Sequence, residues 1–153
     1  MAAEVTGVSH VPHHFVRLHH VGFVVAEIES AAQSFQKSMD AGWDGRIFLD
    51  PLQKVRVTFL APRPGESQIE LVEPLGDDSP VRKFLAEKGG GLHHLCYEVA
   101  DLEAELVALR ARGSYIMKRP KPAVAFDGRL IAWIRTPAAL LIELLETAPA
   151  NRG

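Results

Sequence analysis

Segments that contain histidine and glutamate occur twice in this chain at nearly the same spacing. The segment LHHVGF at 18–23 returns as LHHLCY at 92–97, and IELVE at 69–73 returns as IELLE at 142–146. The second copies lie 74 and 73 residues after the first. Two kinds of motif that share one offset indicate an internal duplication. Because histidine and glutamate are common metal ligands, the duplication predicts a metal site to which both copies contribute.

One histidine of each pair is the better candidate ligand. Side chains alternate between the two faces of a strand, so consecutive histidines are expected to point in opposite directions. His20 shares its face with Gly22, and His94 shares its face with Cys96, and both neighbours are small enough to leave space beside a ligand. We therefore predict His20 and His94 as metal ligands.

Two glutamates complete the predicted ligand set. Glu70 and Glu143 each lie at the centre of an apolar strand, where a lone carboxylate is costly unless it has a partner. Glu73 and Glu146 lie nearer the strand ends and are expected at the surface. We therefore predict Glu70 and Glu143 as the remaining metal ligands.

A set of two imidazoles and two carboxylates suits Zn, Ni, Co, Mn or Fe, and it leaves positions open for water or substrate when the ion is five- or six-coordinate. The alternative is a core in which the histidines are hydrogen-bonded and the glutamates are paired with Arg or Lys; duplication at all four positions favours the metal.

Cys96, between Leu and Tyr, is expected to be a buried small side chain. His10, His13 and His14 lie outside the repeat and are expected to be solvated.

The elements that must position these residues also repeat. For the first copy, the hydrophobic pattern predicts a strand at 18–25, a helix at 27–39, and strands at 46–49, 55–61 and 68–73. For the second copy, it predicts a strand at 92–99, a helix at 102–112, and strands at 115–118, 130–134 and 140–145. The order βαβββ, found twice, predicts an α+β fold of two tandem modules.

The expected layout is a single domain at 17–147 between two short terminal segments. Its parts are an N-terminal arm at 1–16, module one at 17–76, a linker helix within 77–90, module two at 91–147 and a tail at 148–153. In the linker, Ser79 can cap the helix, Pro80 suits its first turn and Gly89 suits its end.

Composition excludes several classes of protein. A chain of 153 residues with 47% hydrophobic residues can bury one sizeable core, and a formal net charge of −2 gives no electrostatic reason to expect a nucleic acid partner. We expect no membrane span and no secretion signal, because no apolar run has the necessary length. A single cysteine is compatible with a reducing compartment, so the expected location is cytoplasmic.

The duplicated modules resemble the vicinal oxygen chelate superfamily, which includes glyoxalase I, extradiol dioxygenases and antibiotic-binding proteins. The resemblance runs from about residue 18 to residue 146 and is strongest to the methylmalonyl-CoA epimerases. The segments that carry this resemblance are 19–22, 53–57, 69–74, 78–81, 83–85, 91–94 and 141–144.

The resemblance implies a fold, a cofactor and a reaction. The two modules would curl into a half-open barrel around a metal cleft, with a divalent ion held by His20, Glu70, His94 and Glu143, and the protein would be a homodimer. The reaction would be epimerisation of a 2-carboxyacyl thioester, such as an acyl-CoA, through an enolate. Glu143 and Glu70 are the carboxylates that could also act as catalytic base.

Several points remain open at this stage. Some epimerases carry a carboxylate on the strand that here spans 55–59, where none stands, so water or Lys54 is also a candidate base. The basic residues at 118–121 fit either a CoA phosphate or a solvated turn. Two other functions use the same fold: a glyoxalase I-like lyase acting on a hemithioacetal, and a metal-free small-molecule binding or resistance protein. Retention of all four ligands and an aromatic content of 7% favour an enzyme.

Overall fold

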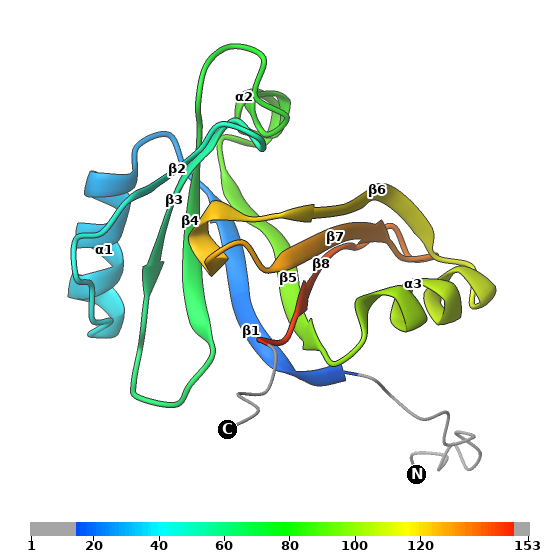
Figure 1. Ribbon diagram of the computed structural model, residues 1–153. Helices are drawn as coiled ribbons and strands as arrows, with labels where there is room; N and C mark the ends of the chain where they lie inside the picture. The colour runs from blue at the N-terminus through cyan, green and yellow to red at the C-terminus, as the bar shows by residue number, and fades with distance from the viewer. Residues whose placement is uncertain (1–14, 149–153) are drawn as a thin grey trace, which may run out of the picture.

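The computed structural model describes residues 15–148 and shows the βαβββ order twice (Figure 1). The first module contains β1 (Phe15–Val24), α1 (Ile28–Met39), β2 (Phe48–Asp50), β3 (Val55–Leu60) and β4 (Gln68–Pro74). After α2 (Arg82–Lys88), the second module contains β5 (Gly91–Val99), α3 (Leu102–Ala111), β6 (Tyr115–Pro122), the short 3-10 helix η1 (Val124–Phe126), β7 (Leu130–Arg135) and β8 (Leu141–Glu146). The predicted α+β fold is confirmed.

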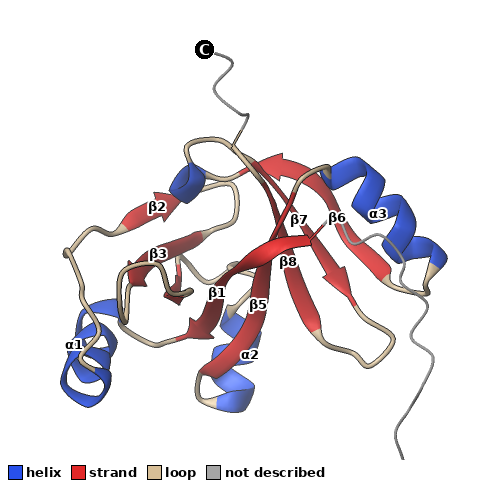
Figure 2. Ribbon diagram, turned by 90° about the horizontal axis from the view of Figure 1, so that it is seen from below, coloured by secondary structure: helices blue, strands red, loops and turns tan. Residues whose placement is uncertain are grey.

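All eight described strands belong to one sheet, in the order β2-β3-β4-β1-β5-β8-β7-β6. Within the modules, β4 runs parallel to β1 and β8 runs parallel to β5, whereas β1 and β5 pair in antiparallel fashion. The modules are therefore joined edge to edge through their first strands. The sheet curls into a half-open barrel, and α1 and α3 lie on opposite flanks of the molecule (Figure 2).

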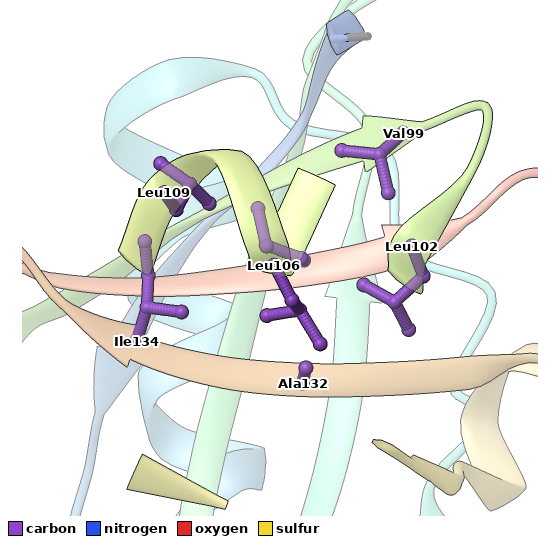
Figure 3. Close-up of a cluster of buried hydrophobic side chains, with 7 residues drawn as sticks. Val99, Leu102, Leu106, Leu109, Ala132 and Ile134 are labelled. Atoms are coloured by element: carbon purple, nitrogen blue, oxygen red, sulfur yellow. The ribbon is translucent and has the colours of Figure 1, made fainter. Parts of the chain in front are cut away.

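Helix α3 shows how packing outside the barrel fixes which residues face inward. Its side chains at Leu102, Leu106 and Leu109 cover Ala132 and Ile134 of β7 (Figure 3). Burial of each such leucine contributes about 1.5–3 kcal/mol to folding. Because strand residues alternate, this packing of β7 leaves the residues between and beside Ala132 and Ile134 to face the inner side of the sheet.

Helix α1 is attached through a residue that we expected at the surface. The carboxylate of Glu73 accepts a hydrogen bond from the Ile28 amide at 2.9 Å and one from Arg56 at 2.8 Å. Its side chain is only 15% exposed. The expectation for Glu73 was therefore wrong, because a carboxylate at the end of β4 meets the unpaired amides at the start of α1. Glu146 is likewise partly buried.

Most boundaries lie within two residues of the predicted ones, and the larger differences are at β1, β6 and α2. Strand β1 begins at Phe15, three residues before the expected start, and so takes in the last residues of the expected arm at 1–16. Strand β6 continues to Pro122, and η1 follows it without a sequence signal that we used. Helix α2 begins at Arg82 with Val81 at the cap position, so Ser79 does not cap it. Gly89 does end this helix, in the left-handed conformation at φ 72°.

Between residues 15 and 148, no helix is both long and apolar enough to cross a membrane. His10, His13 and His14 lie outside the described residues.

Candidate metal centre

The four predicted ligands occupy two parallel rows across four neighbouring strands. In one row, Gly22 of β1 pairs with Glu70 of β4 on one side and with His94 of β5 on the other. Residues directly opposite each other on paired strands share a face, so the carboxylate and the imidazole meet over the glycine.

The second row repeats this arrangement with the modules exchanged. Cys96 of β5 pairs with His20 of β1 on one side and with Glu143 of β8 on the other. The expectation that Gly22 and Cys96 are the small residues beside the ligands is confirmed by this register. In each row, the small residue therefore lies between an imidazole of one module and a carboxylate of the other module.

The donor atoms of the four residues converge. His20 Nε2 lies 3.1 Å from Glu70 Oε2 and 3.5 Å from Glu143 Oε2. His94 Nε2 lies 3.1 Å and 3.2 Å from the same two oxygens, and the two imidazole nitrogens are 3.1 Å apart. All four residues are buried.

This donor set fits a divalent ion. Metal–ligand distances of about 2.0–2.2 Å place neighbouring ligands roughly 3–3.5 Å from one another. The four nitrogen and oxygen atoms have that spacing, and all lie within 4.8 Å of one another. Two buried carboxylates also balance the charge of a divalent cation, which a site of four neutral groups would not do.

Electrostatics within the cluster are strongly coupled. Burial lowers the pKa of His20, but the charge of Glu70 and hydrogen bonds with Cys96, Glu143 and Glu70 outweigh it, so this pKa lies well above its usual range. The pKa of His94 is raised in the same way. Burial raises the pKa of Glu70, but the charge of His20 and hydrogen bonds with both histidines outweigh it, so this pKa lies below its usual range.

Glu143 follows the same balance, with a net lowering of its pKa. Both carboxyl groups are therefore ionised at neutral pH, which is the form that binds a cation.

Two β-bulges place His19 and His93 beside the predicted metal ligands His20 and His94. On β1, Leu18 and His20 pair with the consecutive residues Tyr97 and Cys96, so His19 is an extra residue. On β5, His94 and Leu92 pair with Gly22 and Phe23, so His93 is extra. A bulge bends a strand and redirects its side chains.

As a result, consecutive rings meet instead of diverging. His19 Nδ1 lies 2.8 Å from His20 Nδ1, and His93 Nδ1 lies 2.9 Å from His94 Nδ1. The expectation that the two rings of a pair point to opposite faces was wrong, because strict alternation does not hold at a bulge. Burial, followed by the neighbouring imidazole, lowers the pKa of His19 and of His93 to about 4, so both rings are neutral at pH 7.

Aromatic rings pack against both histidines of the cluster. Phe126 of η1 stacks on His20 with ring centroids 5.9 Å apart, and Phe59 contacts the same imidazole at 5.6 Å. Trp133 of β7 packs against His94 at 4.7 Å, and its indole nitrogen lies 3.2 Å from the side-chain oxygen of Gln53. Gln53 and Trp133 belong to different modules, so this contact also joins them beside the site.

The site opens into a cavity of about 860 Å³. Glu70, His94 and Glu143 line it, whereas His20 is fully buried. Cationic side chains of α2, β6 and β7 also line it, together with two acidic residues outside the ligand set. These are Lys83, Lys88, Lys118 and Arg135, and Asp50 and Glu87.

Other candidates from the sequence are placed less favourably. Lys54 forms an ion pair with Asp78 and is not among the cavity-lining residues. Asp50, which lines the cavity but was not a candidate from the sequence, accepts hydrogen bonds from the amides of Leu52 and Gln53 at 3.0 and 2.9 Å, which commits Oδ1 to a turn. Cys96 is fully buried, as expected. Of the basic residues at 118–121, only Lys118 lines the cavity.

Sequence reasoning did not identify His93, Phe126 or Trp133 as part of the site. Phe126 lies in η1, outside the strands that carry the predicted ligands, so its contribution depends on the curl of the sheet. Trp133 pairs directly with Glu143, and this neighbour depends on the β7–β8 register. His93 carried a detectable signal, since both copies of the motif contain two consecutive histidines.

Residues 19–133 match the model of the Glyoxalase/Bleomycin resistance protein/Dioxygenase superfamily. The chain therefore belongs to this superfamily.

Several similar proteins and solved structures are named as epimerases. The chain is 32% identical over 119 residues to the ethylmalonyl-CoA/methylmalonyl-CoA epimerase of Cereibacter sphaeroides, which covers 77% of this chain and 87% of that protein. It is 34% identical over 97 residues to the mitochondrial methylmalonyl-CoA epimerase of Homo sapiens, and there it spans only 53% of the relative. The crystal structure of methylmalonyl-CoA epimerase from Mycobacterium tuberculosis matches with a TM-score of 0.80 and 29% identity, over 91% of this chain and 93% of that chain. The resemblance stated from sequence is confirmed.

Proposed function

We propose that this protein is a metal-dependent epimerase that acts on a 2-carboxyacyl-CoA thioester of the methylmalonyl-CoA type. The observation that carries the proposal is the convergence of the donor atoms of His20, Glu70, His94 and Glu143 beside a cavity large enough for a small ligand, which the last three of these residues line. The similarity to named epimerases over most of the chain supports the choice of reaction.

Outside the four proposed ligands, the cavity wall has four cationic and two acidic side chains, and Lys83 is paired with Glu87. This excess of positive charge supports an anionic substrate. Lys83, Lys88, Lys118 and Arg135 come from three elements around one cavity. A carboxyacyl-CoA offers a carboxylate next to the reacting carbon and phosphates on its carrier. Cationic side chains bind both kinds of group through charge-assisted hydrogen bonds.

We propose that His20, Glu70, His94 and Glu143 hold the divalent ion, which is Co, Ni, Zn, Mn or Fe by donor chemistry. When bound, the ion would stabilise negative charge that develops on substrate oxygen atoms as the α-proton leaves. The protein itself contributes the position of the donor atoms and the exclusion of water. The two modules fix the donor atoms, and the aromatic rings of Phe59, Phe126 and Trp133 keep bulk water away from the imidazoles.

Proton transfer requires a base within reach of the α-carbon. We assign it to a carboxylate oxygen of Glu143 or Glu70, because both line the cavity and both are ionised at neutral pH. General base catalysis of this kind contributes about 10²–10⁴-fold to the rate.

Two further features of the proposal concern the whole protein. We propose a homodimer, a cytoplasmic location and a single domain that ends at about residue 147 and includes the whole of β1 from Phe15. Size-exclusion chromatography with light scattering would measure the first of these.

The test combines metal analysis with isotope exchange. Protein purified without an affinity tag would be analysed for bound metal and then incubated with methylmalonyl-CoA in deuterated water. We expect a stoichiometric divalent ion and deuterium at the α-carbon, both lost after the metal is stripped and both restored when it is returned.

Other results would replace the proposal. Bound metal without exchange, together with turnover of a hemithioacetal, would assign the protein to glyoxalase-type lyases. Failure to bind any divalent ion after reconstitution would favour a metal-free binding protein.

A further inference from the structure

The bulged histidines occupy equivalent places in the two modules. His19 is the extra residue of β1 and His93 is the extra residue of β5, and each is followed by a proposed ligand. In both cases the contact joins Nδ1 to Nδ1, at 2.8 and 2.9 Å. The same contact therefore forms twice around one site, through the same local distortion of two strands.

The direction of each hydrogen bond follows from the ligand geometry. His20 and His94 present Nε2 to the centre of the cluster. A neutral imidazole whose Nε2 lone pair binds a cation carries its proton on Nδ1. His20 and His94 are then the donors, and Nδ1 of His19 and of His93 must be the acceptors.

Packing holds both acceptor rings in place. The His19 ring contacts Phe126 at 5.3 Å and Phe59 at 6.4 Å, edge to face in both cases. The His93 ring contacts Phe84 of α2 at 5.0 Å and Trp133 at 6.2 Å. An acceptor fixed on both sides can orient the ring that donates to it.

We propose that His19 and His93 are positioning residues that accept a hydrogen bond from Nδ1 of His20 and of His94, and so direct Nε2 of each ligand to the metal. The inference rests on the proposed metal site. Outer-shell partners of metal-binding histidines fix the tautomer and the ring orientation, and their loss weakens metal binding by about 10–100-fold.

Substitution by two related amides separates the hydrogen bond from packing. His19→Asn and His93→Asn keep an acceptor oxygen at the δ position, where the imidazole has Nδ1. His19→Gln and His93→Gln keep the same amide but move it one carbon further, and His19→Leu and His93→Leu remove it. Metal dissociation constants would be measured by chelator competition, together with the visible absorption spectrum of the Co(II)-loaded protein.

We expect the Gln and Leu variants to bind metal about 10–100-fold more weakly and to shift the Co(II) spectrum, while the Asn variants stay close to the unmodified protein. If the Leu variants do not fold, the comparison of Asn with Gln still decides the question. Equal affinities and spectra for Asn, Gln and unmodified protein would overturn the inference alone. An unmodified protein that binds no divalent ion would overturn the proposed function, and the inference with it.

Discussion

The imidazole ring of His94 lies in the space that a side chain at position 22 would occupy if that residue were not glycine. A Cβ atom at Gly22 would lie 2.1 Å from His94 Cε1 and 2.5 Å from both ring nitrogens. No side chain can be that close to an imidazole, so the ring of His94 lies over Gly22 only because residue 22 is glycine. The backbone of β1 at Gly22 is therefore part of the candidate metal site, although it contributes no donor atom there.

We expect Gly22→Ala to displace the His94 ring and to abolish stoichiometric metal binding. Overpacking of this kind destabilises a protein by about 1–3 kcal/mol. The matched control is Gly42→Ala, where the nearest atom to an added Cβ is the Ala61 carbonyl oxygen at 3.4 Å. Metal content and thermal unfolding would be measured for both variants. Full metal loading of Gly22→Ala would contradict the arrangement described.

Glu143→Gln and Glu70→Gln should distinguish the roles of the two carboxylates. A glutamine oxygen can still bind a cation but cannot take a proton at neutral pH. We expect the variant that lacks the base to lose about 10²–10⁴-fold in α-proton exchange while it retains bound metal. The other variant should lose much less. Exchange at the unmodified rate in both metal-loaded variants would rule out either glutamate as base.

The thiol of Cys96 should be unreactive in the folded protein. Burial, followed by the charge of Glu143, raises its pKa to about 12, so almost no thiolate exists at neutral pH. The thiolate is the nucleophilic form of cysteine. We expect no alkylation by iodoacetamide under native conditions and complete alkylation in denaturant. Rapid native alkylation would show that the strands around Cys96 open more readily than the packing indicates.

Glu98 should make stability depend on pH. Burial raises its pKa, but hydrogen bonds from Arg17 and Arg129 outweigh this and hold the pKa below 4.5. The stabilising effect of the carboxylate is thus fully present above about pH 4.5, the ordinary value for a glutamate, and is lost as the pH falls through the lower folded-state value. We expect Glu98→Gln to lower the free energy of unfolding by about 1 kcal/mol at pH 7, since the amide oxygen of glutamine can still accept and hydrogen bonds to charged groups exceed neutral ones by about that amount.

The control for this prediction is Asp77→Asn, at an exposed turn position between β4 and α2. Urea unfolding at pH 7 and at progressively lower pH would compare the three proteins. The difference between Glu98→Gln and unmodified protein should shrink as the pH falls, while Asp77→Asn stays near the unmodified value throughout. A difference that does not change with pH would assign the effect to packing.

The order of elements could be predicted because the duplication supplied each pattern twice. Alternation identified the strands that carry His20 and Glu70, and the face shared with Gly22 followed from the same rule. The convergence of all four donor atoms was predictable for the same reason, since equivalent residues of duplicated modules meet where the modules join.

Other features depend on tertiary structure. The bulges at His19 and His93 break the alternation rule, and they appear only once the two first strands are paired in their actual register. The contact between Gln53 and Trp133 joins residues 80 positions apart, and no local pattern encodes such a pairing. Ser79 was the predicted cap of α2 and Pro80 was predicted in its first turn, but the helix begins at Arg82 with Val81 at the cap position. A serine near a helix end caps it only when its hydroxyl reaches a free amide.

The antiparallel pairing of β1 with β5 also bears on the origin of the protein. Each module by itself carries one histidine and one glutamate of the site, and its first strand would be an open edge of a half-sized sheet. A gene that encoded one module could produce the same cluster if two identical copies associated about a two-fold axis along those edges. Fusion of two such genes would then have allowed the sequence of each half to change independently. The four predicted ligands could be kept while the residues that line the cavity diverged.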